Sequence, residues 1–332
     1  MSITFKALLA HIKSEKFAIE ITNRERDELP EGNTLLKVQY SSLNFKDSMA
    51  LNGNMGKILR NLPMSPGIDL AGIVESTTGD QFKVGDEVIG TGWGLGETHS
   101  GGYSQIAQMH DGWLVKKPTN ISVKHSMSVG TAGLTAMLSV TALENEGITN
   151  SQGNILVTGA SGGVGSISII LLSKLGYSVT AVTGRTESKN YLKELGASDV
   201  LPRDELLAMT RPLNSSKWAG AIDTVGGTIL ANLLSAINYD GAVACCGNTA
   251  GNDLPTTVLP FILRKVKLIG IDSVFCPIEP RTVAWQRLGE LISPKEFELL
   301  TQEISLNDVL ESAKNMLEGK VRGRTVINLK DL

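Results

Sequence analysis

The chain has 332 residues, of which 42% are hydrophobic and 20% are charged, a composition typical of globular proteins rather than disordered ones. Its length exceeds the ~250–300 residues at which a single hydrophobic core stops growing, so we expect two domains. A formal net charge of −3 excludes an overall basic field for nucleic acid, and no uninterrupted apolar run reaches the ~18 residues of a membrane span.

The first part of the chain, residues 1–126, lacks the alternation of strands and helices that marks a nucleotide-binding domain. Short strand candidates separated by Gly, Asn and Asp predict a compact, β-rich, barrel-like domain. The expected strands follow an N-terminal strand around residues 6–11 and cover residues 35–40, 72–75, 87–90 and 103–108.

Strands and helices alternate from residue 127 to residue 274, which predicts a parallel, doubly wound Rossmann sheet. Residues 275–332, with a helix at 306–318 and a strand at 325–329, are expected to return to the first domain and complete it. The expected helices of the nucleotide-binding part are 130–143, 166–175, 188–195 and 229–236, and its strands are 155–158, 177–183, 200–201, 220–224, 241–247 and 267–273.

The most informative segment is a strand that runs into a cluster of glycines. Residues 155–158 are apolar or β-branched, Gly159, Gly162, Gly163 and Gly165 follow, and a helix of small residues comes next. This order of strand, tight turn and helix N-terminus is the place where a dinucleotide diphosphate docks. Glycines let the backbone approach the phosphates, and the unpaired N–H groups of the helix favour their negative charge.

The end of the next strand selects the cofactor. An NAD site carries Asp or Glu about 20 residues after the glycines, where it accepts a hydrogen bond from the ribose 2′-OH. Here the strand ends at Thr183, and no carboxylate appears before Glu187. Thr183 and Arg185 can donate to a 2′-phosphate, and one charge-assisted bond contributes roughly 1.5–3 kcal/mol. We therefore predict NADPH as the cofactor; the alternative is that Arg185 is a solvated turn residue.

Four motifs are spread over nearly the whole chain: residues 66–72 (PGIDLAG), 84–88 (VGDEV), 101–103 (GGY) and 131–136 (TAGLTA). Together they resemble the medium-chain dehydrogenase/reductase superfamily, which joins a GroES-like catalytic domain to a nucleotide-binding domain in this order. Further segments look closest to the bacterial acrylyl-CoA reductases, which are often described only as quinone oxidoreductases. They are residues 41–47 (SSLNFKD), 158–165 (TGASGGVG), 183–185 (TGR), 218–226 (WAGAIDTVG) and 254–264 (LPTTVLPFILR).

The chain departs from the zinc-containing alcohol dehydrogenases of this superfamily. Those enzymes hold zinc with a Cys after the first strands and a His-Glu pair, whereas the corresponding positions here look like Asn44 and Ile68-Asp69. The four histidines are scattered singly and the three cysteines show no C-x-x-C spacing, while zinc needs three or four close ligands. We therefore expect no metal site.

The resemblance implies NADPH-dependent reduction of the carbon–carbon double bond of a 2-enoyl thioester, with acryloyl-CoA as substrate and propanoyl-CoA as product. Such a reaction needs no metal, because hydride adds at the β-carbon and hydrogen-bond donors stabilise the charge on the carbonyl oxygen. Asn44 is the expected catalytic donor, or else a turn residue that bonds its own backbone. Asp47 is expected to cap the helix that begins near Lys46, or else to support the residues of the reacting centre from behind. Met55 stands where some enoyl thioester reductases have a proton-donating Tyr, so water is the expected proton source.

The other contacts are inferred from the resemblance and from position at strand ends. Arg203 is expected to reach the adenosine end of the cofactor or to pair with Asp204. Ile262 is expected to pack on a cofactor face or in the core, and Arg324 to approach a cofactor phosphate. The expected cofactor-binding residues are Phe45, which packs on the nicotinamide, and Ser161, Gly162, Gly163, Val164, Thr183, Gly184, Arg185, Arg203, Asn248, Ile262, Ser273 and Arg324.

Lys57 and Arg60 flank a loop rich in glycine and asparagine. They could meet the phosphates of CoA, but two exposed basic residues also form an ordinary solvated face.

Three functions stay open from the sequence: the thioester reductase, an NADPH oxidoreductase for quinones or small enones, and a non-catalytic NADPH-binding sensor. We expect a cytoplasmic protein whose partner is a small-molecule acyl-CoA or enone rather than nucleic acid or membrane. The strand at 267–273 resembles the edge that pairs across the twofold axis in this superfamily, which favours a homodimer.

Overall fold

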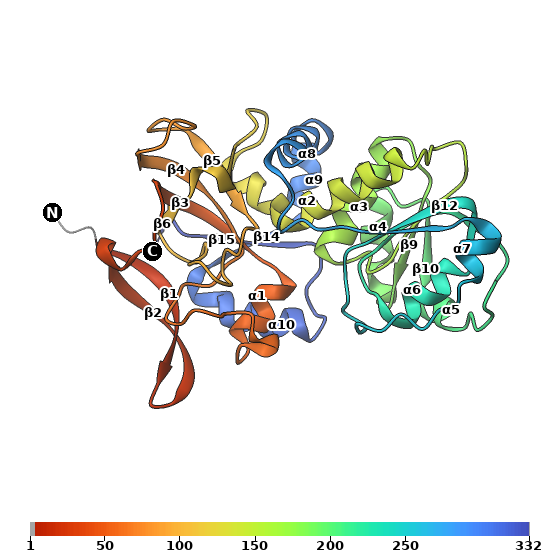
Figure 1. The fold of residues 1–332 in the computed structure, drawn as a ribbon, viewed down its shortest axis with the longest axis horizontal. Helices are drawn as coiled ribbons and strands as arrows, with labels where there is room; N and C mark the ends of the chain where they lie inside the picture. Colours follow the sequence, from red (N-terminus) through yellow and green to blue (C-terminus); the bar gives the residue numbers. More distant parts are fainter. Residues whose placement is uncertain (1–3, 332) are drawn as a thin grey trace. The chain divides into compact units, whose positions relative to one another are not determined.

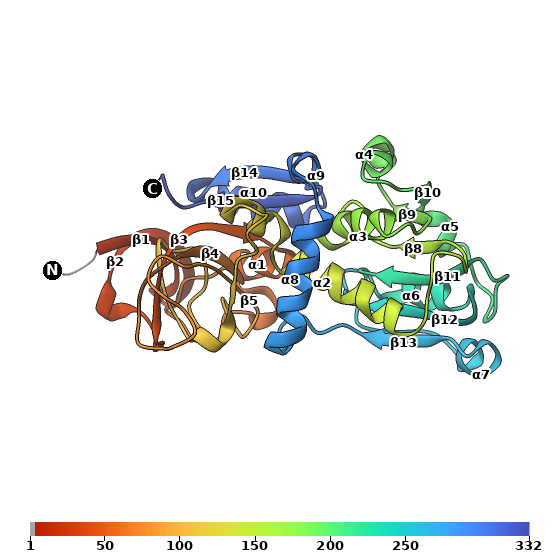
Figure 2. The ribbon, with the colours of Figure 1, turned by 90° about the horizontal axis from the view of Figure 1, so that it is seen from above.

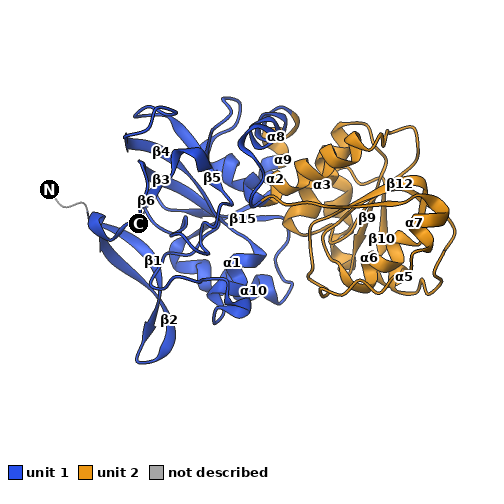
Figure 3. Ribbon diagram, in the orientation of Figure 1, with its two compact units in different colours: residues 1–131, 274–290, 297–332 blue, residues 132–273, 291–296 orange. Residues whose placement is uncertain are grey.

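The computed structural model describes residues 4–331, which form two compact units (Figure 3). Unit 1 comprises Met1–Thr131, Val274–Glu290 and Phe297–Leu332, and unit 2 comprises Ala132–Ser273 and Leu291–Glu296. From the sequence we expected the breaks after residues 126 and 274. The chain instead passes between the units after residues 131 and 273, and it returns briefly to unit 2 at Leu291–Glu296.

Unit 1 is built on a seven-stranded sheet and a separate two-stranded hairpin (Figure 1). The sheet has the order β14-β15-β3-β4-β5-β7, with β6 also paired to β3, and β1 pairs with β2 in the hairpin. The strands are β1 (Thr4–Lys13), β2 (Lys16–Glu25), β3 (Thr34–Leu43), β4 (Asp69–Thr77), β5 (Glu87–Thr91), β6 (Ile106–Met109), β7 (Leu114–Lys116), β14 (Thr301–Ser305) and β15 (Arg324–Asn328).

The helices of unit 1 come from both ends of the chain. They are α1 (Phe45–Leu51), α8 (Ile278–Leu291), α9 (Pro294–Leu300) and α10 (Val309–Leu317), with α8 ending and α9 beginning in the short segment of unit 2. The core of unit 1 joins apolar residues of the first strands, such as Leu36 and Leu70, to Leu306 and Ile327 from the C-terminal segment. The C-terminal tail returns to the first domain because its apolar residues pack in the same core as those of the first strands.

Unit 2 is a six-stranded parallel sheet with the order β10-β9-β8-β11-β12-β13, which Figure 2 shows from one edge to the other. Since the order reverses between β8 and β11, right-handed crossovers place α3 and α6 on opposite faces. The strands are β8 (Ile155–Val157), β9 (Val179–Thr183), β10 (Asp199–Pro202), β11 (Trp218–Asp223), β12 (Ile237–Cys245) and β13 (Lys267–Gly270); the helices are α3 (Gly163–Lys174), α4 (Lys189–Glu194), α5 (Arg203–Leu207), α6 (Gly227–Leu234) and α7 (Leu259–Arg264).

The expected fold class is confirmed: a doubly wound parallel sheet accompanies a β-rich domain. The strand expected at 103–108 begins only at Ile106, because Tyr103 N–H donates to Pro66 O and Gln105 N–H donates to Lys6 O instead of joining the ladder. The hairpin strand β2 and the helices α5, α7, α8 and α9 were not expected from the sequence.

Helix α2 (Val123–Asn145) is longer than the expected helix 130–143 and is broken inside by Gly130. Gly130 has φ +52° and ψ −157°, and a Cβ there would lie 2.4 Å from Asp69 Oδ2 and 2.7 Å from Arg324 Nη2. Only glycine fits this position. By length and composition α2 could also cross a membrane, but 78% of its apolar window is buried inside the fold, as in a core helix.

Candidate functional site

The glycine turn of unit 2 joins β8 to the first turn of α3. Gly159 has φ +55°, and a Cβ on Gly165 would lie 2.4 Å from Gly159 O, so the turn is too tight for side chains at these two positions. Gly162 and Gly163 are half-buried at the start of α3. The N–H groups of this first turn have no acceptor within the helix and are therefore available to an anion.

The end of β9 lies beside the glycine turn. Ser161 Oγ is 3.5 Å from Thr183 Oγ1, and Thr183 Oγ1 accepts a hydrogen bond from Arg185 N–H at 3.0 Å. Gly184 is exposed, and a Cβ added there would meet the guanidinium of Arg203, 3.0 Å from Cζ. The structure thus brings Thr183, Arg185 and Arg203 together.

The pairing of β9 with β10 positions Arg203 beside Gly184, because it sets Pro202, the residue before Arg203, opposite Thr183. Among residues 4–331 no ion pair joins Arg203 to Asp204, the alternative left open by the sequence. This edge therefore carries two basic side chains and no carboxylate at the strand end, which fits a phosphorylated ribose better than a free 2′-OH.

The neighbouring strands end in polar groups on the same edge of the sheet. Asn248 is exposed after β12 and donates through Nδ2 to Asn252 Oδ1 at 2.7 Å. Ser273 follows β13, is 9% exposed and accepts a hydrogen bond from Thr135 Oγ1 at 2.8 Å. Both positions lie where parallel sheets bind ligands.

Asp223 is a residue of this edge that the sequence did not indicate. It ends β11, accepts from Thr158 Oγ1 at 2.7 Å and from Gly226 N–H at 2.8 Å, and burial raises its pKa. It thereby fixes the turns that follow β8 and β11, between which the strand order reverses. Its signals in the sequence were a carboxylate at a strand end and its place in the motif at residues 218–226.

Ile262 is not brought to this edge. It lies on α7, which precedes β13 and therefore sits where the strands begin, as Figure 2 shows. Its side chain is 68% exposed, which also excludes the alternative of core packing. The expected contact with the cofactor has no support in this geometry.

The residues of unit 2 fit a dinucleotide with a 2′-phosphate. The tight turn leaves room for a diphosphate at the helix start, and Thr183, Arg185 and Arg203 supply donors at the ribose end. No part of this donor set carries a negative charge.

In unit 1, a buried polar cluster surrounds Asn44 at the start of α1. Asp69 Oδ2 accepts from Asn44 Nδ2 at 2.8 Å and from Ser42 Oγ at 2.5 Å, and Asp69 Oδ1 accepts from the Thr131 hydroxyl. Arg324 Nη2 lies 3.7 Å from Asp69 Oδ2 and completes the charge balance. Asp69 is fully buried, so these donors replace the water it lost.

Asn44 is only 8% exposed and its amide is committed inside this cluster. Its Nδ2 donates to Asp69 Oδ2 at 2.8 Å and to Asp47 Oδ2 at 3.1 Å, while its Oδ1 accepts from Arg324 Nη1 at 3.0 Å. Both amide hydrogens are taken, so the geometry does not support the expected donation to a substrate oxygen. The alternative expectation, that Asn44 is a turn residue bonding its own backbone, is also incomplete. The hydrogen-bond partners of the Asn44 amide come from β4 and β15 as well as from α1.

Arg324 is 2% exposed. It donates to Asn44 Oδ1, to Ser42 Oγ at 2.8 Å and, through Nε, to Ser128 O at 3.0 Å. These bonds commit the guanidinium within unit 1, and the expected approach to a cofactor phosphate has no support here.

Asp47 caps α1, as expected: its Oδ2 accepts from Asn44 N–H at 2.9 Å and its Oδ1 accepts from Ile68 N–H at 2.9 Å. Burial, and then the nearby negative charge of Asp69, raise the pKa of Asp47 to about 7, although the hydrogen bonds from Asn44 and Ile68 lower it. Phe45, the first residue of the helix, is 41% exposed and thus accessible to a ligand.

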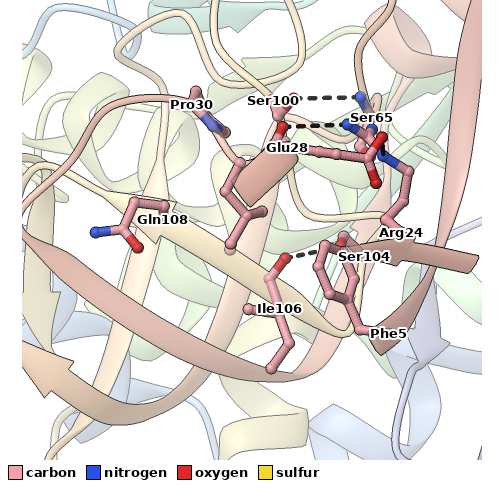
Figure 4. Close-up of a pocket in the computed structure, with 12 residues that line it drawn as sticks. Phe5, Arg24, Glu28, Pro30, Ser65, Ser100, Ser104, Ile106 and Gln108 are labelled. Carbon is pink, nitrogen blue, oxygen red and sulfur yellow. Dashed lines mark hydrogen bonds and ion pairs between the residues drawn. The ribbon is translucent and has the colours of Figure 1, made fainter. Parts of the chain in front are cut away.

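No group of three or more His, Cys, Asp or Glu within residues 4–331 is arranged to hold a metal ion. A small hollow on unit 1 lies elsewhere than the Asn44 cluster, and Figure 4 shows Arg24 paired with Glu28 at its rim, with Nε 3.0 Å from Oε1. None of the residues expected from the sequence lines this hollow.

Two family models match the chain: an alcohol dehydrogenase GroES-like domain at residues 30–119 and a zinc-binding dehydrogenase at residues 163–288. The acrylyl-CoA reductase AcuI of Ruegeria pomeroyi is 45% identical over 303 residues, which are 91% of this chain and 92% of that protein. The structure of Escherichia coli K-12 YhdH with bound NADPH is 48% identical, covers 98% of this chain and 100% of its own, and superposes with a TM-score of 0.94.

The chain belongs to the medium-chain dehydrogenase/reductase family. It is therefore an NAD(P)-dependent oxidoreductase, as the motifs predicted. Bacillus subtilis YhfP, whose name places it provisionally among the quinone oxidoreductases, is 42% identical in a structure with NAD bound that covers 98% of this chain and 100% of its own, with a TM-score of 0.94. Relatives at similar identity thus hold NADPH in one structure and NAD in another.

Asp47 gives the stability of this oxidoreductase a distinctive pH dependence. Between about pH 4 and pH 7 the folded protein keeps a proton on Asp47 that the unfolded chain has lost, so the contribution of Asp47 to stability falls as the pH rises through this window. In Asp47→Asn the decline is absent. We expect the melting temperature of the wild type to fall relative to that of Asp47→Asn across this range, as measured by differential scanning fluorimetry.

Asp308→Asn is the matched control, because Asp308 occupies the same capping position for Ser305 but in an exposed capping box. The control should follow the wild type over the same window. Parallel pH profiles for the wild type and Asp47→Asn would contradict a raised pKa at Asp47.

Proposed function

We propose that this protein catalyses the NADPH-dependent reduction of the carbon–carbon double bond of a 2-enoyl thioester, with acryloyl-CoA converted to propanoyl-CoA without a metal. The observation that supports the choice of cofactor is the end of β9 in unit 2, which carries no carboxylate and where the guanidinium of Arg203 lies on Gly184 beside Thr183 and Arg185. The substrate class is supported by the 45% identity to an acrylyl-CoA reductase over nearly the full length.

When bound, NADPH supplies the hydride that reaches the β-carbon of the alkene, and a proton from water completes the α-carbon. The turn at Ser161, Gly162, Gly163 and Val164 holds the diphosphate with backbone N–H groups. Thr183, Gly184, Arg185 and Arg203 bind the ribose 2′-phosphate, and Asn248 and Ser273 bind toward the nicotinamide end.

Unit 1 contributes the groups that orient the substrate. Phe45 offers an exposed apolar ring for the nicotinamide to pack on. Asn44 acts as a positioning residue, since its amide links Asp47, Asp69 and Arg324 and so fixes the start of α1 that carries Phe45. The chemistry is proposed without a metal, because hydride can add directly to the β-carbon of an alkene that is conjugated to a thioester carbonyl.

Two alternatives remain: reduction of quinones or small enones, which the name of Bacillus subtilis YhfP favours, and NADPH binding without catalysis. We expect saturable NADPH oxidation with acryloyl-CoA, weaker turnover of crotonoyl-CoA and little with a small quinone, measured in parallel by loss of absorbance of the reduced nicotinamide. Saturable turnover with the quinone alone would replace the thioester reductase by the first alternative, and binding of NADPH without turnover would replace it by the second.

The preference for NADPH depends on the guanidinium groups at the ribose end. Arg185→Ala removes one charge-assisted hydrogen bond, so the KM for NADPH should rise roughly ten- to a hundred-fold while the KM for NADH changes little. Arg203→Ala should act in the same direction. Arg211→Ala, an exposed arginine of the same unit, is the control. Equal effects on both cofactors would remove the specificity argument.

A homodimer through unit 2 is proposed because β13 is an edge strand and exposed apolar side chains lie nearby. These are Tyr239 at the start of β12, Val258 before α7, and Ile262 and Leu263 on α7. Sedimentation velocity should show a dimer that Ile262→Glu weakens, whereas the control Val84→Glu, on an exposed loop of unit 1, should stay dimeric. A monomeric wild type would refute this assembly.

A cytoplasmic location also stays a prediction.

A further inference from the structure

A loop of unit 1 after α1 carries basic side chains and no acidic ones. No Asp or Glu stands between Asp47 and Asp69 in the sequence, and both of these carboxylates are buried. Lys57 and Arg60 lie in this interval with exposed side chains. The surface of the loop is therefore positive, although the chain as a whole carries a net charge of −3.

The two charges have no acidic partner. Among residues 4–331 no carboxylate oxygen lies within the 4.0 Å of an ion pair from Lys57 or Arg60. Lys46, nearby on α1, shows the contrast: its Nζ is 2.9 Å from Glu97 Oε1. A nearby carboxylate is thus available, but it neutralises Lys46 and leaves the loop charged.

The loop is held rigidly. Asn54 accepts from Leu59 N–H at 2.8 Å and donates to Leu59 O at 2.9 Å, and Arg60 N–H donates to Glu97 O at 2.8 Å. Lys57 has φ +53°, a left-handed conformation that lysine rarely adopts. The surrounding bonds therefore hold the backbone at Lys57 and Arg60 in place, so the two basic side chains start from fixed positions on one loop.

Apolar side chains are exposed on the same loop and at the start of the neighbouring helix α1. Met55 is 50% exposed on the loop, and Phe45 is 41% exposed at the start of the helix that the loop packs against, where a Cβ on Gly56 would lie 3.3 Å from Met49 Cε. A surface that combines exposed apolar groups with two unpaired cations suits a ligand with an apolar acyl arm and a phosphorylated end.

We propose that Lys57 and Arg60 bind the phosphate groups of the CoA portion of the substrate, an inference that rests on the proposed thioester reductase function. Lysine and arginine form charge-assisted hydrogen bonds with phosphate oxygens. These contacts lie far from the reacting double bond, and their binding energy orients a small acyl group that offers little surface of its own. Quinones and small enones carry no phosphate, so this site favours CoA esters over them.

The test compares acryloyl-CoA with acryloyl-pantetheine, which has the same thioester but no phosphate. In the double variant K57A/R60A, the KM for acryloyl-CoA should rise roughly ten- to a hundred-fold, as expected for a net loss equal to one charge-assisted bond, with kcat little changed. The kinetic constants for acryloyl-pantetheine should stay within about twofold of the wild type. Acryloyl-phosphopantetheine, as an intermediate substrate, shows which phosphate is bound.

The matched control is K6A/K37A, which removes two exposed lysines from strands β1 and β3 of the same unit. It should leave all three esters unaffected. Melting temperatures of both double variants should match the wild type, since every substituted side chain is exposed. An equal loss with acryloyl-CoA and acryloyl-pantetheine, or no loss with either, would overturn the proposal.

Calorimetric titration with free CoA separates this site from the proposed reaction. Wild-type protein should bind CoA, and K57A/R60A should bind it at least tenfold more weakly, with a smaller dependence on salt. If the wild type binds CoA in this way but reduces no thioester, the proposed function fails while the site stands. If the wild type reduces acryloyl-CoA and the double variant binds CoA equally well, the site fails while the function stands.

Discussion

The buried carboxylate of Asp69 is the interaction on which unit 1 depends. An ionised carboxylate without water is costly unless it is paired and hydrogen-bonded, and Asp69 meets this need with three hydrogen-bond donors and an ion pair to Arg324. Ser42 comes from β3, Asn44 from the start of α1, Thr131 from α2 and Arg324 from β15. The charge thus fixes parts of the chain that are up to some 280 positions apart in sequence, and Gly130 leaves the space that it needs.

Unit 2 binds its charged ligand by a different physical means. Its proposed anion site consists of backbone N–H groups at the start of α3, positioned by a glycine turn that admits no side chain at Gly159 or Gly165. Asp223 holds the adjacent turns through Thr158 and Gly226, so side-chain charge organises the frame rather than meeting the ligand. In the proposed function, the guanidinium groups of Arg185 and Arg203 act only at the ribose end of the cofactor, where they would set its specificity.

The fold followed from the sequence because each unit has a strong local signal. Alternating strands and helices, the glycine cluster and the missing carboxylate at Thr183 are local patterns, and they predicted the parallel sheet and the cofactor edge. The roles of Asn44 and Arg324 could not be read in this way, because their partners are distant in sequence and are set by the pairing of β15 with β3. Ile262 was misplaced for a related reason. An apolar residue in a helical segment does not reveal at which edge of the sheet its helix lies.

The packing of Arg203 on Gly184 couples the effects of substitutions at these two positions. A Cβ at position 184 would lie 3.0 Å from Cζ of Arg203. The effect of a substitution at either position therefore depends on the residue present at the other position. This is epistasis with a steric cause. A side chain at 184 is accommodated more easily where residue 203 is short, and a chain with both replacements would have no guanidinium beside the end of β9.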